Sequence, residues 1–268
     1  MVPVCSRRDE MSLSEKQILH GFWGWNERSA WPPKHITYFE DYQPSETLSL
    51  EITQLDRVSY YRQTKIVDQW CAELPYLKEV KYLWFVSRIN QKVFDAACNM
   101  PNLEGMFIKW SGIKNIEALH IPKKLRHLWL GSSSQVENID VLGELNQLIT
   151  LTLEQLNQIS DFSVLANLTS LEGLGINGGM WTAQKIDNIK PLADLHNLKY
   201  LTLINTQTKD KSFDPILNLT ELVRFDSSWN YPEAEFEKLK SLPKLKYGNV
   251  ETSWKEVKAR LDERLKSM

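Results

Sequence analysis

Few residues in this sequence have the types and spacing needed for catalysis or cofactor binding. Gly173-Leu-Gly175-Ile-Asn-Gly178 matches the G-x-G-x-x-G pattern of dinucleotide-binding loops. That chemistry requires the glycines in a turn between a strand and a helix, where backbone N–H groups contact a pyrophosphate. Here the first two glycines fall inside an alternating segment typical of a strand. We therefore interpret the match as a coincidence.

The potential metal ligands show no spacing typical of a metal site. They are five histidines and three cysteines: His20, His35, His120, His127, His196, Cys5, Cys71 and Cys98. The sequence contains no G-x-x-x-x-G-K-[ST], H-E-x-x-H or G-x-S-x-G motif. No two carboxylates form a pair that we can assign as acid and base. We therefore predict a protein that is not an enzyme and needs no cofactor or metal.

The composition is that of an ordinary globular protein of 268 residues, 42% hydrophobic and 25% charged. A net charge of −2 gives no long-range attraction to nucleic acid or to an anionic membrane, so we expect neither as a partner. The three cysteines do not form the clusters of disulfide-stapled secreted repeat proteins. No apolar segment follows the charges near the N-terminus, as a signal peptide would require. These features together favour the cytoplasm.

An internal repeat organises most of the chain. The pattern L-x-x-L-x-L, clearest at Leu148-Ile-Thr-Leu-Thr-Leu153, recurs with conservative changes along the sequence. Its copies begin at residues 80, 103, 125, 148, 171, 198, 222 and 245, with spacings of 23, 22, 23, 23, 27, 24 and 23. A second apolar pattern at i, i+3 and i+6, as in Phe162, Leu165 and Leu168, indicates a short helix or 3-10 turn in each unit.

On these motifs the chain resembles the bacterial leucine-rich-repeat proteins, close to the short repeats of internalins. The best match is the segment 148–170, and the resemblance covers roughly residues 78–252. It implies an α/β solenoid, with a curved parallel sheet on the concave face and short helices or 3-10 turns on the convex face. The sequence departs from the family in its asparagine ladder. Only Asn157 and Asn230 lie near the right phase, which predicts irregular turns after the strands.

The ends of the chain do not follow the repeat. We expect residues 1–79 to form an N-terminal cap. A strand at 47–53 and a helix at 59–74 would make a first irregular repeat within it. The solenoid then spans 80–252, and a helix at 253–268 covers the last repeat. The aromatic-rich segment 21–33 has two interpretations. It either covers the open end of the core or forms a separate binding site.

The strand period of two predicts which side chains face outward from the sheet. One outward column contains Trp84, Phe107 and Trp129 on three successive strands, followed by smaller and more polar residues. Exposed aromatic patches mark interaction sites, and Trp and Tyr are frequent in binding hot spots. We predict that this column faces a partner. The alternatives are that the N-terminal cap folds over the rings or that the rings only stack on one another.

The candidate partner-binding residues come from this column, from the column before it and from the ends of the strands. They are Tyr82, Trp84, Phe107, Lys109, Trp110, His127, Trp129, Tyr200, Arg224, Asp226 and Trp229.

The predicted function is that of a non-enzymatic module that binds another protein on its concave face. Eight strands at a spacing of about 4.8 Å would present a face roughly 35 Å long, which suits a protein better than a small molecule. A bacterial inhibitor or immunity-type protein, monomeric when free, is the concrete version that we favour. Two alternatives remain open. One is a secreted internalin-like effector or adhesin, and the other is carbohydrate binding through the concave aromatic residues.

Overall fold

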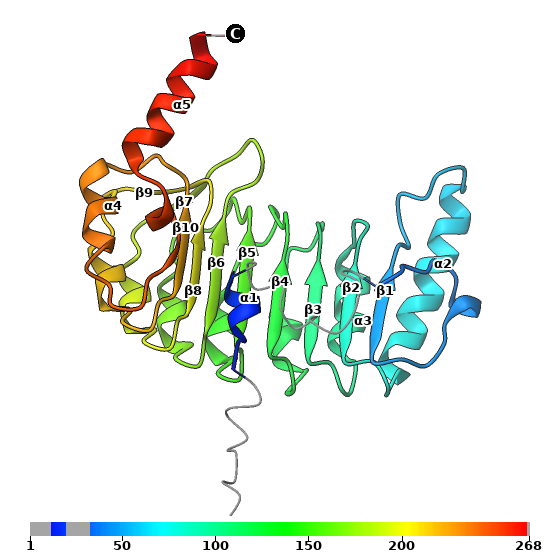
Figure 1. Ribbon diagram of the computed structural model, residues 1–268. Helices are drawn as coiled ribbons and strands as arrows, with labels where there is room; N and C mark the ends of the chain where they lie inside the picture. Colours follow the sequence, from blue (N-terminus) through cyan, green and yellow to red (C-terminus); the bar gives the residue numbers. More distant parts are fainter. Residues whose placement is uncertain (1–11, 20–32, 267–268) are drawn as a thin grey trace, which may run out of the picture.

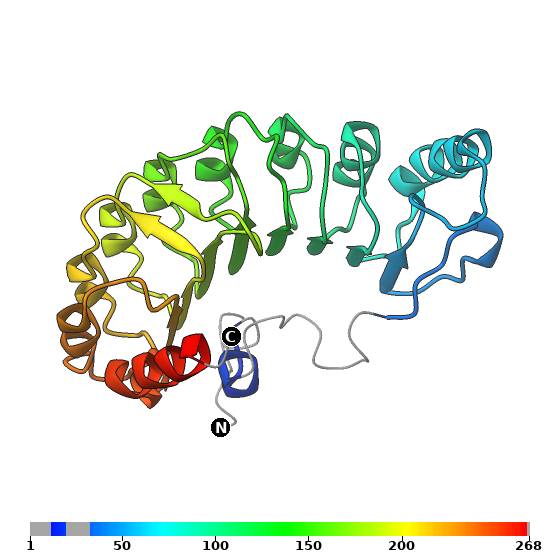
Figure 2. The ribbon, with the colours of Figure 1, turned by 90° about the horizontal axis from the view of Figure 1, so that it is seen from above.

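Parallel strands line the inner side of an arc in the computed structural model, which describes residues 12–19 and 33–266 (Figures 1 and 2). Within these residues nine strands form one continuous sheet. They are β1 (Thr47–Leu50), β2 (Tyr82–Phe85), β3 (Gly105–Ile108), β4 (His127–Leu130), β5 (Thr150–Glu154), β6 (Gly173–Asn177), β8 (Tyr200–Leu203), β10 (Arg224–Ser227) and β11 (Tyr247–Gly248). Each pair is in register at equivalent repeat positions, so the predicted solenoid is confirmed.

The outer side of the arc consists of helices in the first two units and mostly of 3-10 turns thereafter (Figure 2). They are α2 (Tyr60–Glu73), η3 (Leu74–Tyr76), α3 (Gln91–Cys98), η4 (Glu117–His120), η5 (Asp140–Glu144), η6 (Ser163–Asn167), η7 (Lys190–Asp194), η8 (Asp214–Asn218) and α4 (Glu233–Leu239). The repeat fixes where the turns begin, because a polar side chain accepts a hydrogen bond from the backbone N–H two residues later. Asn138, Asp161 and Asn188 do so at 2.6, 2.8 and 3.0 Å.

The long repeat of 27 residues carries an additional small sheet. Strands β7 (Gln184–Ile186) and β9 (Thr206–Thr208) pair in parallel outside the main sheet. The buried Gln184 side chain donates to the carbonyl groups of Leu156 and Ile159, at 3.2 and 2.8 Å. Asn230 donates to the Thr206 carbonyl, whereas Asn157 is exposed. Glutamine and asparagine side chains thus both complete the backbone hydrogen bonding in this part of the solenoid.

The N-terminal end of the arc is closed by α2 and the segment before β1, which includes η2 (Phe39–Asp41). Trp70 of α2 is fully buried, and its Nε1–H donates to the Thr37 carbonyl at 2.8 Å. Phe39 and Tyr42 pack edge-on against its ring. Residues 21–32 of the aromatic-rich segment lie outside the described residues.

At the C-terminal end, the short turn η9 (Asn249–Glu251) precedes α5 (Trp254–Lys266). Ser253 accepts a hydrogen bond from the Glu256 N–H and so caps this helix. Trp254 packs against the core, and from there α5 extends away from the sheet (Figure 1). The first turn of α5 and helix α4 thus contact the last repeat, while the rest of α5 projects beyond it.

A steric prediction follows from the close stacking of the repeats. A Cβ atom added to Gly131 would lie 2.4 Å from the Lys109 carbonyl oxygen and 2.5 Å from that of Ile108. Because backbone atoms of the neighbouring repeat cannot move aside, Gly131→Ala should lower the free energy of unfolding by about 1–3 kcal/mol in chemical denaturation. Gly112→Ala is the control, since its nearest neighbour is the flexible Arg88 side chain at 3.2 Å. Equal stability of the two variants would contradict this packing.

Candidate functional site

The concave face over β3 and β4 carries two half-buried aromatic side chains from the predicted column. The rings of Phe107 and Trp129 lie in register, with centroids 5.1 Å apart and planes tilted by 51°. Trp129 also hydrogen-bonds to Glu154, the last residue of β5. Burial raises the pKa of the Glu154 carboxyl, and the bonds from Trp129 and the Ser132 backbone offset part of this rise. The two rings therefore form a fixed, partly accessible apolar surface.

Trp84, the third ring of the column, is not part of that accessible surface. It is paired with Ser49 and Phe107 in the sheet, as predicted, but none of its surface is exposed. The prediction of exposure is wrong here because the outward phase of a strand fixes only the direction of a side chain, not what covers it. The neighbouring Tyr82 remains partly exposed, and its hydroxyl donates to Glu104 at 3.3 Å.

Lys109 and Trp110 lie at the end of β3 and are exposed. The Lys109 ammonium group lies 4.8 Å from the centre of the Trp110 ring, and the Trp110 Nε1–H donates to Gln54 at 3.0 Å. The ring is thus held in one orientation while about a third of the residue (36%) stays accessible. This pair adds an apolar and positively charged element beside the aromatic rings of the concave face.

His127 begins β4 and lies partly buried on the concave face. Its Nδ1 lies 2.9 Å from the Thr150 hydroxyl on β5. Burial, and then the nearby charge of Arg126, lower the pKa of His127 to about 3. The imidazole is therefore neutral at physiological pH and acts as a hydrogen-bonding side chain.

The C-terminal half of the face holds an ion pair on an aromatic ring. Arg224 Nε donates to Asp226 Oδ2 at 2.6 Å, and the guanidinium group lies 5.7 Å from the centre of the Tyr200 ring. Burial by itself lowers the pKa of Arg224, but the bond to Asp226 and its charge raise the value overall. The guanidinium group therefore stays charged, and the two side chains are about a quarter and a fifth exposed (24% and 21%).

Tyr200 is covered, although its phase predicts an exposed position. Only 6% of the residue is accessible, because Leu13 and Ile18 from the N-terminal helix α1 (Glu15–Leu19) pack on it. This helix lies on the concave side of the sheet in both views of the ribbon (Figures 1 and 2). Burial also raises the pKa of the Tyr200 hydroxyl. The prediction that Tyr200 faces a partner is therefore wrong in the free protein, because a distant segment of the chain occupies this part of the face.

Trp229 does not belong to the concave face. Its ring stacks on Phe236 of α4, with centroids 4.6 Å apart, and it packs against the core at the C-terminal end. Its position just past β10 suggested a partner-facing role, but here α4 folds back and covers the ring. We therefore assign Trp229 a packing role in the last repeat.

Between the two halves of the face lie small buried side chains on β5 and β6. They are Thr150, Thr152, Gly173 and Gly175. A Cβ atom on Gly175 would lie 2.9 Å from Thr202 and 3.1 Å from Thr152. The predicted site residues therefore form two separate groups, one over β2–β4 and one over β8 and β10.

Two highly exposed apolar residues lie outside the predicted set. Met180 and Trp181 are 83% and 90% exposed in the loop between β6 and β7, which rises above the strand ends in Figure 1. Ile204, just after β8, is also exposed. The spacing of 27 residues, with four more than the preceding repeats, could have indicated this loop. It provides an apolar element at the edge of the concave face.

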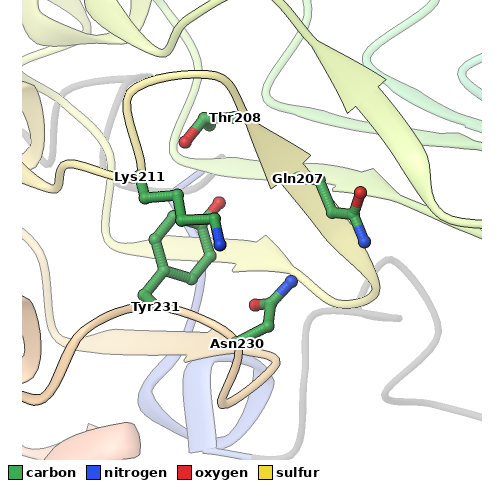
Figure 3. Close-up of a pocket in the computed structure, with 5 residues that line it drawn as sticks. All are labelled: Gln207, Thr208, Lys211, Asn230 and Tyr231. Atoms are coloured by element: carbon green, nitrogen blue, oxygen red, sulfur yellow. The ribbon is translucent and has the colours of Figure 1, made fainter.

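A small cavity near this edge is formed by polar side chains from β9 and the following segments (Figure 3). Its volume is about 160 Å³, and its lining residues are Gln207, Thr208, Lys211, Asn230 and Tyr231. Pockets for small organic ligands usually measure about 300–1,000 Å³ and are mostly apolar. This cavity therefore does not favour a cofactor site.

Among residues 12–19 and 33–266, no group of three or more His, Cys, Asp or Glu side chains could hold a metal ion. Over the same part of the chain, no helix has the length and apolar character needed to cross a bilayer.

Comparison with known proteins gives matches only at the level of structure. No protein-family model matches the chain, and no curated protein matches it in sequence. An internalin of Listeria monocytogenes, inlF, shares 23% identity with it over 77% of this chain and 58% of its own, with a TM-score of 0.52. The chain has the leucine-rich-repeat fold. An internalin C2 from the same organism shares 27% identity over 66% of this chain and 72% of its own, with a TM-score of 0.49.

The likeness to inlF concerns the fold of the repeats. The chain spans a little over half (58%) of the length of the inlF structure.

The burial of the two tryptophans predicts different effects of their replacement. Trp84→Ala should lower the free energy of unfolding by about 3–5 kcal/mol, because it leaves a large cavity in a fully covered position. Trp129→Ala should lower the free energy of unfolding by a smaller amount, because part of that ring already contacts water. Chemical denaturation of the two variants checks this. A Trp84→Ala variant as stable as the wild type would show that the ring is accessible after all.

The lowered pKa of His127 predicts a stability that depends on pH. The pKa of His127 is lower in the folded protein than in the unfolded chain. The contribution of neutral His127 to the free energy of unfolding is therefore fully present above pH 6.5 and is lost as the pH falls toward 3. Between pH 7.5 and pH 5.5, His127 should lower the free energy of unfolding by about 1.4 kcal/mol. His127→Gln should remove this part of the loss, whereas His196→Gln, at an exposed position, should not. Identical pH profiles for wild type and His127→Gln would contradict the assignment.

Proposed function

We propose that this leucine-rich-repeat protein is a non-enzymatic module that binds another protein on its concave face. The observation that carries the proposal is the group of accessible aromatic residues Phe107, Trp110 and Trp129, with Lys109 beside them. Aromatic rings held in fixed orientations contribute much contact area at a small entropic cost, which is why they are frequent in hot spots. The exposed Met180 and Trp181, in the loop after β6, add a second apolar element.

The face favours a protein over a sugar. Carbohydrate binding through this column would need the open faces of Trp84, Phe107 and Trp129. Trp84 is fully buried, and Phe107 and Trp129 lie against one another. The remaining features are a long curved surface with separated apolar and charged groups, which suits the irregular surface of a folded partner.

We further propose that the partner is a toxin or enzyme that the protein holds inactive in the bacterial cytoplasm, and that the free protein is a monomer. A secreted effector or adhesin that binds a host protein is the second candidate. The likeness to the internalin inlF of Listeria monocytogenes supports this candidate. Cell fractionation separates the two candidates: recovery of the protein from the medium would rule out the cytoplasmic one.

Affinity capture from the cell that encodes the protein tests the proposed face. Tagged wild type should retain a partner, and Trp110→Ala and Trp129→Ala should each weaken binding by about 30-fold, the loss of a typical hot-spot side chain. Tyr61→Ala is the matched control, since Tyr61 is a 70% exposed aromatic residue on α2, on the outer side of the arc.

Two results would contradict the proposed face. One is a loss of partner binding in Tyr61→Ala as large as in the two concave variants. The other is unchanged partner binding in both Trp110→Ala and Trp129→Ala. Binding of the purified protein to a glycan array, lost in the same two concave variants, would instead establish the carbohydrate alternative.

A further inference from the structure

Helix α1 is specified by its own sequence, although it has only five residues. The Ser14 N–H donates to the Gln17 side chain at 2.6 Å, and the Gln17 N–H donates to the Ser14 hydroxyl at 3.2 Å. This reciprocal pair is a capping box. Leu13 before the cap and Ile18 in the first turn occupy the positions of a hydrophobic staple. A helix this short is not stable alone in water, so it depends on the surface that it contacts.

That surface is a row of residues one position before strands β5, β6, β8 and β10. Along the whole sheet this row is charged at most positions: Glu46, Lys81, Glu104, Arg126, Glu172, Lys199 and Lys246. The two apolar exceptions, Ile149 and Val223, lie on either side of Glu172 and Lys199. The staple residues Leu13 and Ile18 pack on Ile149, Tyr200 and Val223, and only 7% and 5% of their surface remains accessible. The row therefore holds an apolar site matched to two side chains of a helix.

Glu172 makes this site selective for the beginning of a helix. Its Oε2 accepts hydrogen bonds from the Leu13 backbone N–H at 2.6 Å and from the Ser12 hydroxyl at 3.1 Å. Lys199 lies 3.1 Å from the same oxygen and also donates to the Ser12 hydroxyl. The Glu172 and Lys199 side chains are 19% and 25% exposed. A carboxylate in this position satisfies backbone N–H groups that precede a helix and favours its positive end.

We propose that Ile149, Glu172, Lys199, Tyr200 and Val223 form a docking site for the start of a short amphipathic helix of the partner protein, and that α1 occupies it as an internal ligand. The partner helix would carry a hydroxyl residue, an apolar residue, a capping pair and a second apolar residue five positions after the first. This inference rests on the proposed function of the concave face. A partner that uses the site must displace α1, so the apparent affinity equals the intrinsic affinity multiplied by the fraction of molecules in which α1 is released.

A peptide-binding experiment tests the site without the partner. The probe is an acetylated, fluorescently labelled peptide with the sequence of residues 12–19, Ser-Leu-Ser-Glu-Lys-Gln-Ile-Leu. The full-length double variant Leu13→Asp, Ile18→Asp releases α1, and its peptide affinity, measured by fluorescence anisotropy, should be at least about tenfold higher than that of the wild type. Adding Glu172→Ala should abolish this gain. Glu15→Ala, at an exposed position of α1, should behave as wild type.

Three outcomes would overturn the proposal. The first is no peptide binding by the released variant up to millimolar concentration. The second is equal binding by wild type and released variant. The third is a wild type that light scattering shows to be a dimer and that becomes a monomer in the released variant, because α1 would then serve a second copy. Unchanged melting temperatures confirm that the variants remain folded, since Leu13 and Ile18 lie outside the main core.

The partner captured on the wild-type protein provides the second readout. Its affinity for the released variant should be at least about tenfold higher than for the wild type. An unchanged affinity would overturn the proposed docking site, while the losses caused by Trp110→Ala and Trp129→Ala would still support binding on the concave face. Absence of any partner would contradict the proposed function, and the peptide experiment would still decide whether the site binds a helix.

Discussion

The parallel stacking of repeats at the spacing of β-strands is the constraint on which the rest of this structure depends. No single repeat buries its own leucines, but Leu128, Leu151, Leu174 and Leu201 on successive strands form a continuous buried core. The same stacking fixes the distance between outward side chains on the concave side. Gly175 illustrates its strictness, because the threonines of the neighbouring strands leave no space there for a methyl group.

This constraint also divides the concave face. The small residues of β5 and β6 separate the aromatic group over β2–β4 from the ion pair of Arg224 and Asp226 over β8 and β10. One row lower, at Ile149, Glu172, Lys199 and Val223, the face is occupied by α1. The protein thus presents one partly accessible group of aromatic residues and one site that already contains a helix. A partner that covers both would gain contacts with the first and compete with α1 for the second.

The sequence predicts the local geometry well and the accessibility of side chains poorly. The spacing of the L-x-x-L-x-L pattern places Tyr82, His127 and Arg224 at the first positions of their strands, as the structure has them. The repeat pattern predicts these positions because neighbouring repeats pair in the same register along the solenoid. The burial of Tyr200 and the packing of Trp229 under α4 depend on contacts between distant segments, which no repeat pattern records. The capping box at Ser14 and Gln17 and the apolar Ile149 and Val223 were the available indications of α1 and its site.

Hydrogen–deuterium exchange with and without the captured partner tests the central claim, binding on the concave face with displacement of α1, most directly. The account predicts slower exchange of the amides around Trp110 and Trp129 on binding, together with faster exchange of the α1 amides that are protected in the free protein. Slower exchange confined to the outer turns η5 to η8, with α1 unchanged, would contradict it.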